Sequence, residues 1–158
     1  MGVMPMTGMP EGTVKIESEG DIVAVRKTVR EISCECGFGI TDVTRIVTAA
    51  SELARNIYHF AGHGDMLWHI LETSESIGIE LIFVDQGPGI EDIDKAMELG
   101  YTTGKGLGLG LPGAKRLMGE MEIQSQPGKG TTVTVRKWLK KLYEQSDAAR
   151  NNKLIAYQ

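Results

Sequence analysis

Two glycine-rich turns hold the residues of this chain whose types and spacing best suit chemistry. The first, Asp85-Gln86-Gly87-Pro88-Gly89, follows an aliphatic run that predicts a strand, and the second spans Gly104–Gly110 just before a predicted helix. Glycine lets backbone N–H groups approach phosphate oxygens closely, and the N-terminus of a helix adds a favourable dipole. Two such turns in succession predict a nucleotide-binding site.

A polar pair precedes both turns. Glu52 and Asn56 are four residues apart in a segment with helical periodicity, so they are expected on one helix face, away from the apolar stripe. A carboxylate can take a proton or orient a nucleophile, and an amide oxygen can coordinate Mg²⁺ that carries phosphates. Asp85 can accept a hydrogen bond from the exocyclic amine of adenine. An isolated pair of this kind is usually a solvated face, but its place before two glycine turns favours a functional site.

Other known glycine loops fit this pattern less well. A Walker A loop needs Ser or Thr after its lysine, whereas Gly106 follows Lys105. Residues 108–113 match the spacing of a dinucleotide fingerprint, but Tyr101-Thr102-Thr103 precedes them where a buried strand should end. A flexible linker is also disfavoured, because leucines alternate with the glycines and no second domain is expected to follow.

The elements that must position these residues follow from hydrophobic periodicity and turn signals. Strands are expected at 14–17, 66–71, 77–84, 121–125 and 131–138, and helices at about 22–32, 42–57, 92–99 and 112–118. Thr41 and Asp42 are expected to cap the second helix. Elements in this order predict an α+β sandwich, with a mixed, mostly antiparallel sheet and helices on one face.

The composition is that of an ordinary folded domain. The 158 residues are 41% hydrophobic and 24% charged, which suits one domain at 13–139 between a flexible leader, 1–12, and a polar tail, 140–158. A net charge of −4 and a pI near 5.4 argue against a nucleic-acid partner. No stretch has the apolar length of a membrane span or the core of a signal peptide, so a cytoplasmic protein is expected. Cys34 and Cys36 are expected to be reduced packing residues.

Three segments together resemble a known superfamily. Residues 51–56, 85–89 and 104–110 are similar to the N box and the two glycine boxes of the GHKL ATPases and kinases, and Gly130-Thr131 resembles their final Gly-Thr element. The fold implied by this resemblance is the two-layer α/β sandwich of the Bergerat type. Residues 51–58, 98–103, 108–118 and 137–139 look most like the RsbT-like switch serine/threonine kinases of bacterial stress signalling. The resemblance covers roughly residues 14–139 and implies ATP binding.

The resemblance also implies a role for each matched residue. Asp85 would recognise adenine with help from Thr131, Asn56 would bind Mg²⁺, and Glu52 would position or deprotonate the attacking hydroxyl. Gly87 and Gly89 would let the backbone pass close to the nucleotide. Residues 101–110 would form a lid over the phosphates, with contacts from Gly104, Lys105, Gly106, Leu107, Gly108, Leu109 and Gly110. Lys105 is as well explained by a solvated lid lysine as by a phosphate contact.

The activity implied is ATP-dependent serine/threonine phosphorylation in a partner-switching pathway. The substrate would be a STAS-domain antagonist in a stressosome-like complex, and the released kinase would bind and activate a PP2C-type phosphatase. An anti-sigma factor that sequesters a sigma subunit and uses the same ATP site is the alternative. A sensor histidine-kinase module is disfavoured, because the chain has no room for the helix pair that carries a phospho-accepting histidine.

Overall fold

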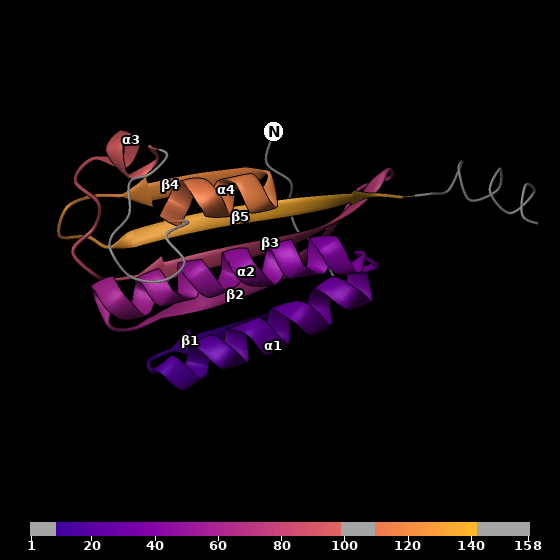
Figure 1. Cartoon of the computed structure of the whole chain (residues 1–158), viewed down its shortest axis with the longest axis horizontal. Helices are drawn as coiled ribbons and strands as arrows, with labels where there is room; N and C mark the ends of the chain where they lie inside the picture. Colours follow the sequence, from indigo (N-terminus) through magenta and orange to yellow (C-terminus); the bar gives the residue numbers. More distant parts are fainter. Residues whose placement is uncertain (1–8, 99–109, 142–158) are drawn as a thin grey trace, which may run out of the picture.

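A five-stranded antiparallel sheet with helices along one face forms the protein. The computed structural model describes residues 9–98 and 110–141. Its elements are β1 (Glu11–Ile16), α1 (Glu19–Cys36), α2 (Ile40–Asn56), a π-helical turn η1 (Ile57–Ala61), β2 (Gly64–Glu72), β3 (Ser76–Asp85), α3 (Ile93–Ala96), α4 (Gly110–Met118), β4 (Glu120–Ser125) and β5 (Thr131–Lys140). Figure 1 shows α1, α2 and α4 lying over the same face of the sheet, while α3 stands at one end. The predicted α+β sandwich is confirmed.

The strand order, β1-β2-β3-β5-β4, brings four strand termini together at one end of the sheet. Asp85, the last residue of β3, pairs with Gly64 at the start of β2 and with Thr131 at the start of β5. Ser125, the last residue of β4, pairs with the same Thr131. Every pairing in the described sheet is antiparallel, and the register puts Asp85 and Thr131 next to one another although they are far apart in the chain.

The core lies between the helices and the inner face of the sheet. Alternate residues of β3, namely Ile79, Leu81 and Phe83, are buried there, as period-2 alternation predicts for a strand with one covered face. The stripe of α2 that packs on them includes Ile46 and Leu53. Each such side chain contributes about 1.5–3 kcal/mol by burial, so β3 and α2 are the rigid elements on which the site is built.

Helix α1 is longer than its apolar repeat indicates. The carboxylate of Asp21 accepts the backbone N–H groups of Glu17, at 2.8 Å, and of Ser18, at 3.0 Å. These bonds satisfy donors that a helix N-terminus leaves open, and the bond from Glu17 is the main reason that the pKa of Asp21 is lowered. At the other end Gly37 takes a left-handed conformation, with φ 96°, and stops the helix.

The predicted cap of α2 is wrong. The N-cap is Gly39, without a side-chain hydrogen bond, and Thr41 and Asp42 lie inside the first turn. Phe38 is buried just before the cap and fixes the entry of the chain, so the helix begins earlier than the polar residues indicate. Asp42 pairs instead with Arg45 at 3.0 Å. A carboxylate in the first turn of a helix also interacts favourably with the helix dipole.

The first strand begins inside the stretch expected as a leader. β1 starts at Glu11, where its backbone pairs with His69 of β2, and the ring of Trp68 lies against the backbone of Gly12. Backbone pairing at a sheet edge does not require an apolar side chain, so hydrophobic periodicity does not reveal this start. The rest of the leader, 1–8, and the tail from 142 lie outside the described residues. Within the described ranges, no helix is long and apolar enough to cross a membrane.

The two cysteines differ in their surroundings. Both are free thiols, but Cys34 is exposed, whereas Cys36 is partly buried and packs against the core. Burial, and secondarily the charge of Glu35, raises the pKa of Cys36 to about 11, which keeps that thiol protonated and unreactive near neutral pH. The prediction of a packing residue holds for Cys36 and is wrong for Cys34.

Candidate functional site

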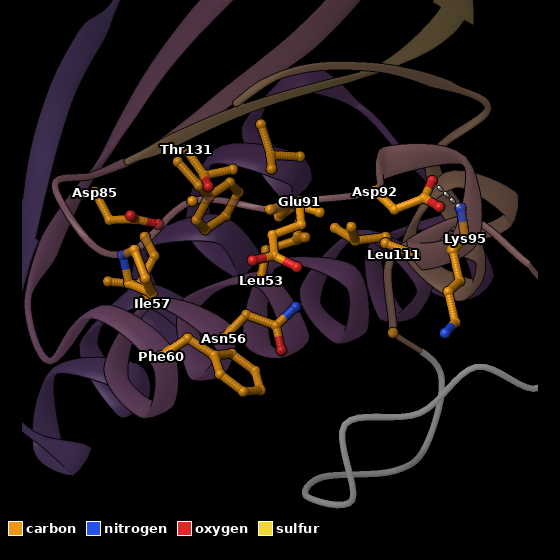
Figure 2. A pocket seen from close by; sticks show the side chains of 17 residues that line it. Leu53, Asn56, Ile57, Phe60, Asp85, Glu91, Asp92, Lys95, Leu111 and Thr131 are labelled. Carbon is orange, nitrogen blue, oxygen red and sulfur yellow. Dashed lines mark hydrogen bonds between the residues drawn. The ribbon is translucent and has the colours of Figure 1, made fainter. Parts of the chain in front are cut away.

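One cavity collects five of the seven predicted site residues that the structure describes. It has a volume of about 570 Å³ and lies between the end of α2, the first glycine turn, α3 and the starts of α4 and β5. Asn56, Asp85, Gly89, Gly110 and Thr131 all line it. Figure 2 shows Asp85 and Thr131 together at one end, and Asn56 on the helical wall. The floor includes Leu53, Phe83 and Val133, so the cavity combines an apolar surface with a few polar groups, as small-molecule sites do.

The carboxylate of Asp85 is held in place by the turn that follows it. Its Oδ1 accepts the backbone N–H of Gly87 at 2.9 Å. Gly87 does not line the cavity; its α-carbon faces η1, where a Cβ would collide with Ala61. The tight turn therefore takes up one acceptor site on Oδ1, and the carboxylate keeps further acceptor sites for a ligand.

The first glycine turn is docked on the β4–β5 hairpin. The N–H of Gly128 donates to the carbonyl oxygen of Pro88 at 2.7 Å, and the N–H of Ile90 donates to Ser125 Oγ at 2.8 Å. Between these two bonds Gly89 has φ 78°, and a Cβ there would collide with the carbonyl of Gln126. Two segments far apart in the sequence thus form one wall at the base of the cavity.

Replacing Gly89 by alanine should therefore destabilise the protein more than the same change at Gly128. Both glycines have φ 78°, but a Cβ at Gly128 meets no atom within 4 Å. The left-handed conformation costs an alanine about 1–2 kcal/mol at either position, whereas the collision at Gly89 adds about 1–3 kcal/mol. Urea unfolding of Gly89→Ala and Gly128→Ala measures the difference. Equal losses of stability would show that the turn is not held against the hairpin.

Asn56 and Glu52 do not share one environment. Asn56 is partly exposed at the last turn of α2 and lines the cavity. Glu52 is only 4% exposed and is not among the lining residues. Since α2 is flanked by both α1 and α4 and covers β3, its polar surface is narrow. Glu52 is therefore more buried than a solvated helix face would be, and its place beside Asn56 in the site and its chemical role remain predictions.

Phe60 is a cavity residue that hydrophobic periodicity did not single out. After Asn56 the helix widens into the π turn η1, in which the N–H of Gly62 donates to the carbonyl of Ile57 at 2.9 Å. Ile57 is buried, while Phe60 is 49% exposed and lines the cavity. A π turn within a helix often marks a functional site. No sequence signal distinguishes a five-residue π turn from the end of an ordinary helix.

Three charged residues of one short segment line the part of the cavity beyond Asp85. Glu91, Asp92 and Lys95 line it, and Asp92 Oδ1 accepts the N–H of Lys95 at 3.0 Å, which caps α3. Figure 2 shows the carboxylate of Glu91 directed into the cavity between the Asp85 end and the Lys95 end. The sequence predicts a short helix here, and the cap explains where it begins.

The start of α4 closes the remaining side. Gly110, with φ 56°, and the buried Leu111 line the cavity, and Pro112 lies in the first turn, where a missing N–H has no cost. The helix begins two residues earlier than predicted. Gly104, Lys105, Gly106, Leu107, Gly108 and Leu109, the other residues predicted to contact phosphates, lie outside the described residues. The first turn of α4 is nonetheless at the cavity, as a phosphate-binding helix start requires.

Comparison with known proteins agrees with this geometry. Residues 41–141 match the family model of histidine kinase-, DNA gyrase B- and HSP90-like ATPases. The serine/threonine-protein kinase RsbT of Bacillus subtilis (strain 168) is 48% identical over 130 residues, which are 82% of this chain and 98% of that protein. An anti-sigma F factor of Thermoanaerobacter sp. (strain X514) is 33% identical over 86% of this chain and 97% of its own length.

A solved structure supports the same fold. The crystal structure of the RsbU and RsbW domains of a Mycobacterium tuberculosis protein matches with a TM-score of 0.55 at 22% identity, over 84% of this chain and 32% of that one. The family match spans α2, the Asp85 turn, α4 and the β4–β5 hairpin, which are the elements that enclose the cavity. The chain therefore belongs to the histidine kinase-, DNA gyrase B- and HSP90-like ATPase family, in the branch of the RsbT-like serine/threonine-protein kinases.

Proposed function

We propose that this protein transfers the γ-phosphoryl group of ATP to a serine or threonine of a STAS-domain antagonist protein and, once released, activates a PP2C-type phosphatase by binding it. Serine/threonine kinase activity and the use of ATP belong to its branch of the family. The observation that carries the proposal is the meeting of Asn56, Asp85 and Thr131 in one cavity. Their separation along the cavity suits a ligand with a base at one end and phosphates at the other.

The base end fits adenine. The carboxylate of Asp85 can accept a hydrogen bond from the exocyclic amine, and the apolar floor of Leu53, Phe83 and Val133 suits a flat ring. An amine that donates to a carboxylate makes a charge-assisted bond, the stronger class of hydrogen bond. The proposal therefore assigns base recognition to Asp85 and Thr131.

The helical wall fits a metal ion carried by the phosphates. Within residues 9–98 and 110–141, no three His, Cys, Asp or Glu side chains gather to form a metal site. Mg²⁺ commonly keeps one or two protein ligands and completes its shell with phosphate oxygens and water, so the amide oxygen of Asn56 suffices. When bound, the ion neutralises charge on the transferred group. Asn56 would hold this ion at the phosphate end of the cavity.

Glu52 positions or deprotonates the attacking hydroxyl in this proposal. It lies one helical turn before Asn56, so an acceptor side chain that reaches the phosphate end also comes near this part of α2. Because Glu52 is buried, the acceptor hydroxyl has to come close to α2 to contact its carboxylate. The lid of residues 101–110 would close over the phosphates and complete the site only with nucleotide bound.

The partner assignment rests on the similarity to RsbT, which extends over nearly the whole of that protein. The proposal also places the kinase in the cytoplasm, bound to a stressosome-like complex until it is released. An anti-sigma factor is the second candidate, because anti-sigma F factors are 33% identical over most of their length. In that case the main partner would be a sigma subunit, and phosphorylation of an antagonist would release it.

A labelling experiment separates the two candidates. The purified protein is incubated with radiolabelled ATP, Mg²⁺ and each STAS-domain protein of the same cell, and a pull-down tests each sigma subunit and each PP2C-type phosphatase. Label on a STAS serine or threonine together with capture of the phosphatase is the expected result. Capture of a sigma subunit without capture of a phosphatase would favour the anti-sigma factor. The absence of any labelled protein would contradict the kinase proposal.

A further inference from the structure

Ser125 lies at the centre of a hydrogen-bond cluster beneath the base end of the cavity. Its Oγ accepts the backbone N–H of Ile90 at 2.8 Å and lies 3.1 Å from the carbonyl oxygen of Gly130. It also lies 2.8 Å from Thr131 Oγ1, where either hydroxyl can be the donor. Ser125 does not itself line the cavity, whereas Thr131 does. Of its bonded neighbours, Ile90 and Thr131 line the cavity, and Thr131 is the one bonded through a side-chain hydroxyl.

The number of protons in this cluster decides the direction of its bonds. A serine hydroxyl has one proton to donate, and a carbonyl oxygen can only accept. If the proton of Ser125 goes to the carbonyl of Gly130, the contact with Thr131 requires Thr131 to donate to Ser125. This is the arrangement in which all three contacts of Ser125 are hydrogen bonds at once. It uses the only hydroxyl proton of Thr131 inside the wall.

Thr131 is then left with lone pairs alone on the cavity side. Together with the carboxylate of Asp85, which is acceptor-only when ionised, it makes both polar side chains of the base end acceptors. An exocyclic amine such as that of adenine has protons for these acceptors. A base with a carbonyl oxygen at the same position, as in hypoxanthine or guanine, places an acceptor against acceptors and loses those bonds.

We propose that Ser125 is a positioning residue for base selection, because it holds the hydroxyl proton of Thr131 away from the cavity. The inference rests on the proposed placement of adenine beside Asp85 and Thr131. It explains why a side chain outside the cavity is bonded at once to the glycine turn, to Gly130 and to Thr131.

The test compares ATP with ITP, which differs from ATP by a carbonyl in place of the exocyclic amine. Calorimetric titration gives both affinities for the wild type and for Ser125→Ala. The variant frees the proton of Thr131, so the preference for ATP over ITP should fall about three- to tenfold, the size of one hydrogen bond made or lost. Ser125→Thr keeps the hydroxyl and should retain the preference.

Two controls separate base selection from a purely structural role. In a Thr131→Val background, Ser125→Ala should leave the ratio of the two affinities unchanged, because Ser125 acts through the Thr131 hydroxyl. Loss of the Ile90 bond alone would lower the affinities for ATP and ITP equally and leave their ratio unchanged. An unchanged ratio in Ser125→Ala would therefore overturn the inference. If that variant does not fold, Ser125→Cys, whose sulfur is only a weak acceptor for the Thr131 proton, is expected to lower the ratio. An unchanged ratio there overturns the inference as well.

The same titrations on Asp85→Asn tell a failure of this inference from a failure of the proposed function. If Asp85→Asn changes the ratio and Ser125→Ala does not, only the role of Ser125 falls. If neither changes it, the base is not recognised at this end of the cavity, and both the inference and the proposed site fall.

Discussion

Replacing Asn56 by alanine should reduce phosphoryl transfer by more than about a hundredfold while the fold remains intact, because the variant removes the proposed protein ligand of Mg²⁺. Phosphoryl transfer depends on placement and charge neutralisation, so a metal ion that is poorly held lowers the rate even when ATP still binds. The fold should survive, because Asn56 is partly exposed and alanine has the higher helix propensity. Initial rates of partner labelling at several Mg²⁺ concentrations measure the effect.

Two further variants make this prediction specific. Asn56→Asp keeps an oxygen that can bind Mg²⁺ and should retain more activity than Asn56→Ala. Thr44→Ala changes an exposed residue near the other end of α2, away from the cavity, and should leave the rate unchanged. A folded Asn56→Ala protein with normal activity at low Mg²⁺ would remove Asn56 from the metal site.

Replacing Asp85 by asparagine should weaken ATP binding about tenfold or more and reduce the preference for ATP over ITP. The N–H of Gly87 already donates to Oδ1, so the variant keeps that bond only if its amide oxygen stays there. The amide nitrogen then points to the cavity and opposes the amine of adenine. A lost hydrogen bond to a charged group costs about 1.5–3 kcal/mol, which is roughly tenfold or more in affinity. For ITP the new donor faces a carbonyl, so its affinity should fall less or rise.

Asp92→Asn is the matched control for this change. Asp92 lines the same cavity at its other end, where it caps α3, and asparagine is an equally good N-cap. This substitution also changes a carboxylate to an amide, but away from the base, so it should leave the preference for ATP over ITP unchanged. Calorimetry on the two variants with ATP and ITP gives the comparison. Unchanged ATP affinity in Asp85→Asn, or an equal change in Asp92→Asn, would contradict recognition of adenine by Asp85.

The sequence by itself determined the fold class and the positions of the main polar groups. Alternating apolar residues define β3, and Asp85 must lie at its end, because Gly87, Pro88 and Gly89 cannot continue a paired strand. The hairpin of β4 and β5 follows equally from alternation and from turn residues. The assignment of Asn56 to the same site followed from the resemblance of residues 51–56 to the N box of the family. These are local features, so neighbouring residues suffice to specify them.

Only the tertiary structure decided which polar groups share an environment. Glu52 and Asn56 are one helical turn apart in the sequence, but in the folded protein Glu52 is buried, whereas Asn56 is partly exposed and lines the cavity. The contact between Ser125 and Ile90 joins residues 35 positions apart, and it depends on how the glycine turn docks on the hairpin. Burial and long-range hydrogen bonds are set by the packing of whole elements against one another. Neither is encoded in the residues adjacent in the chain.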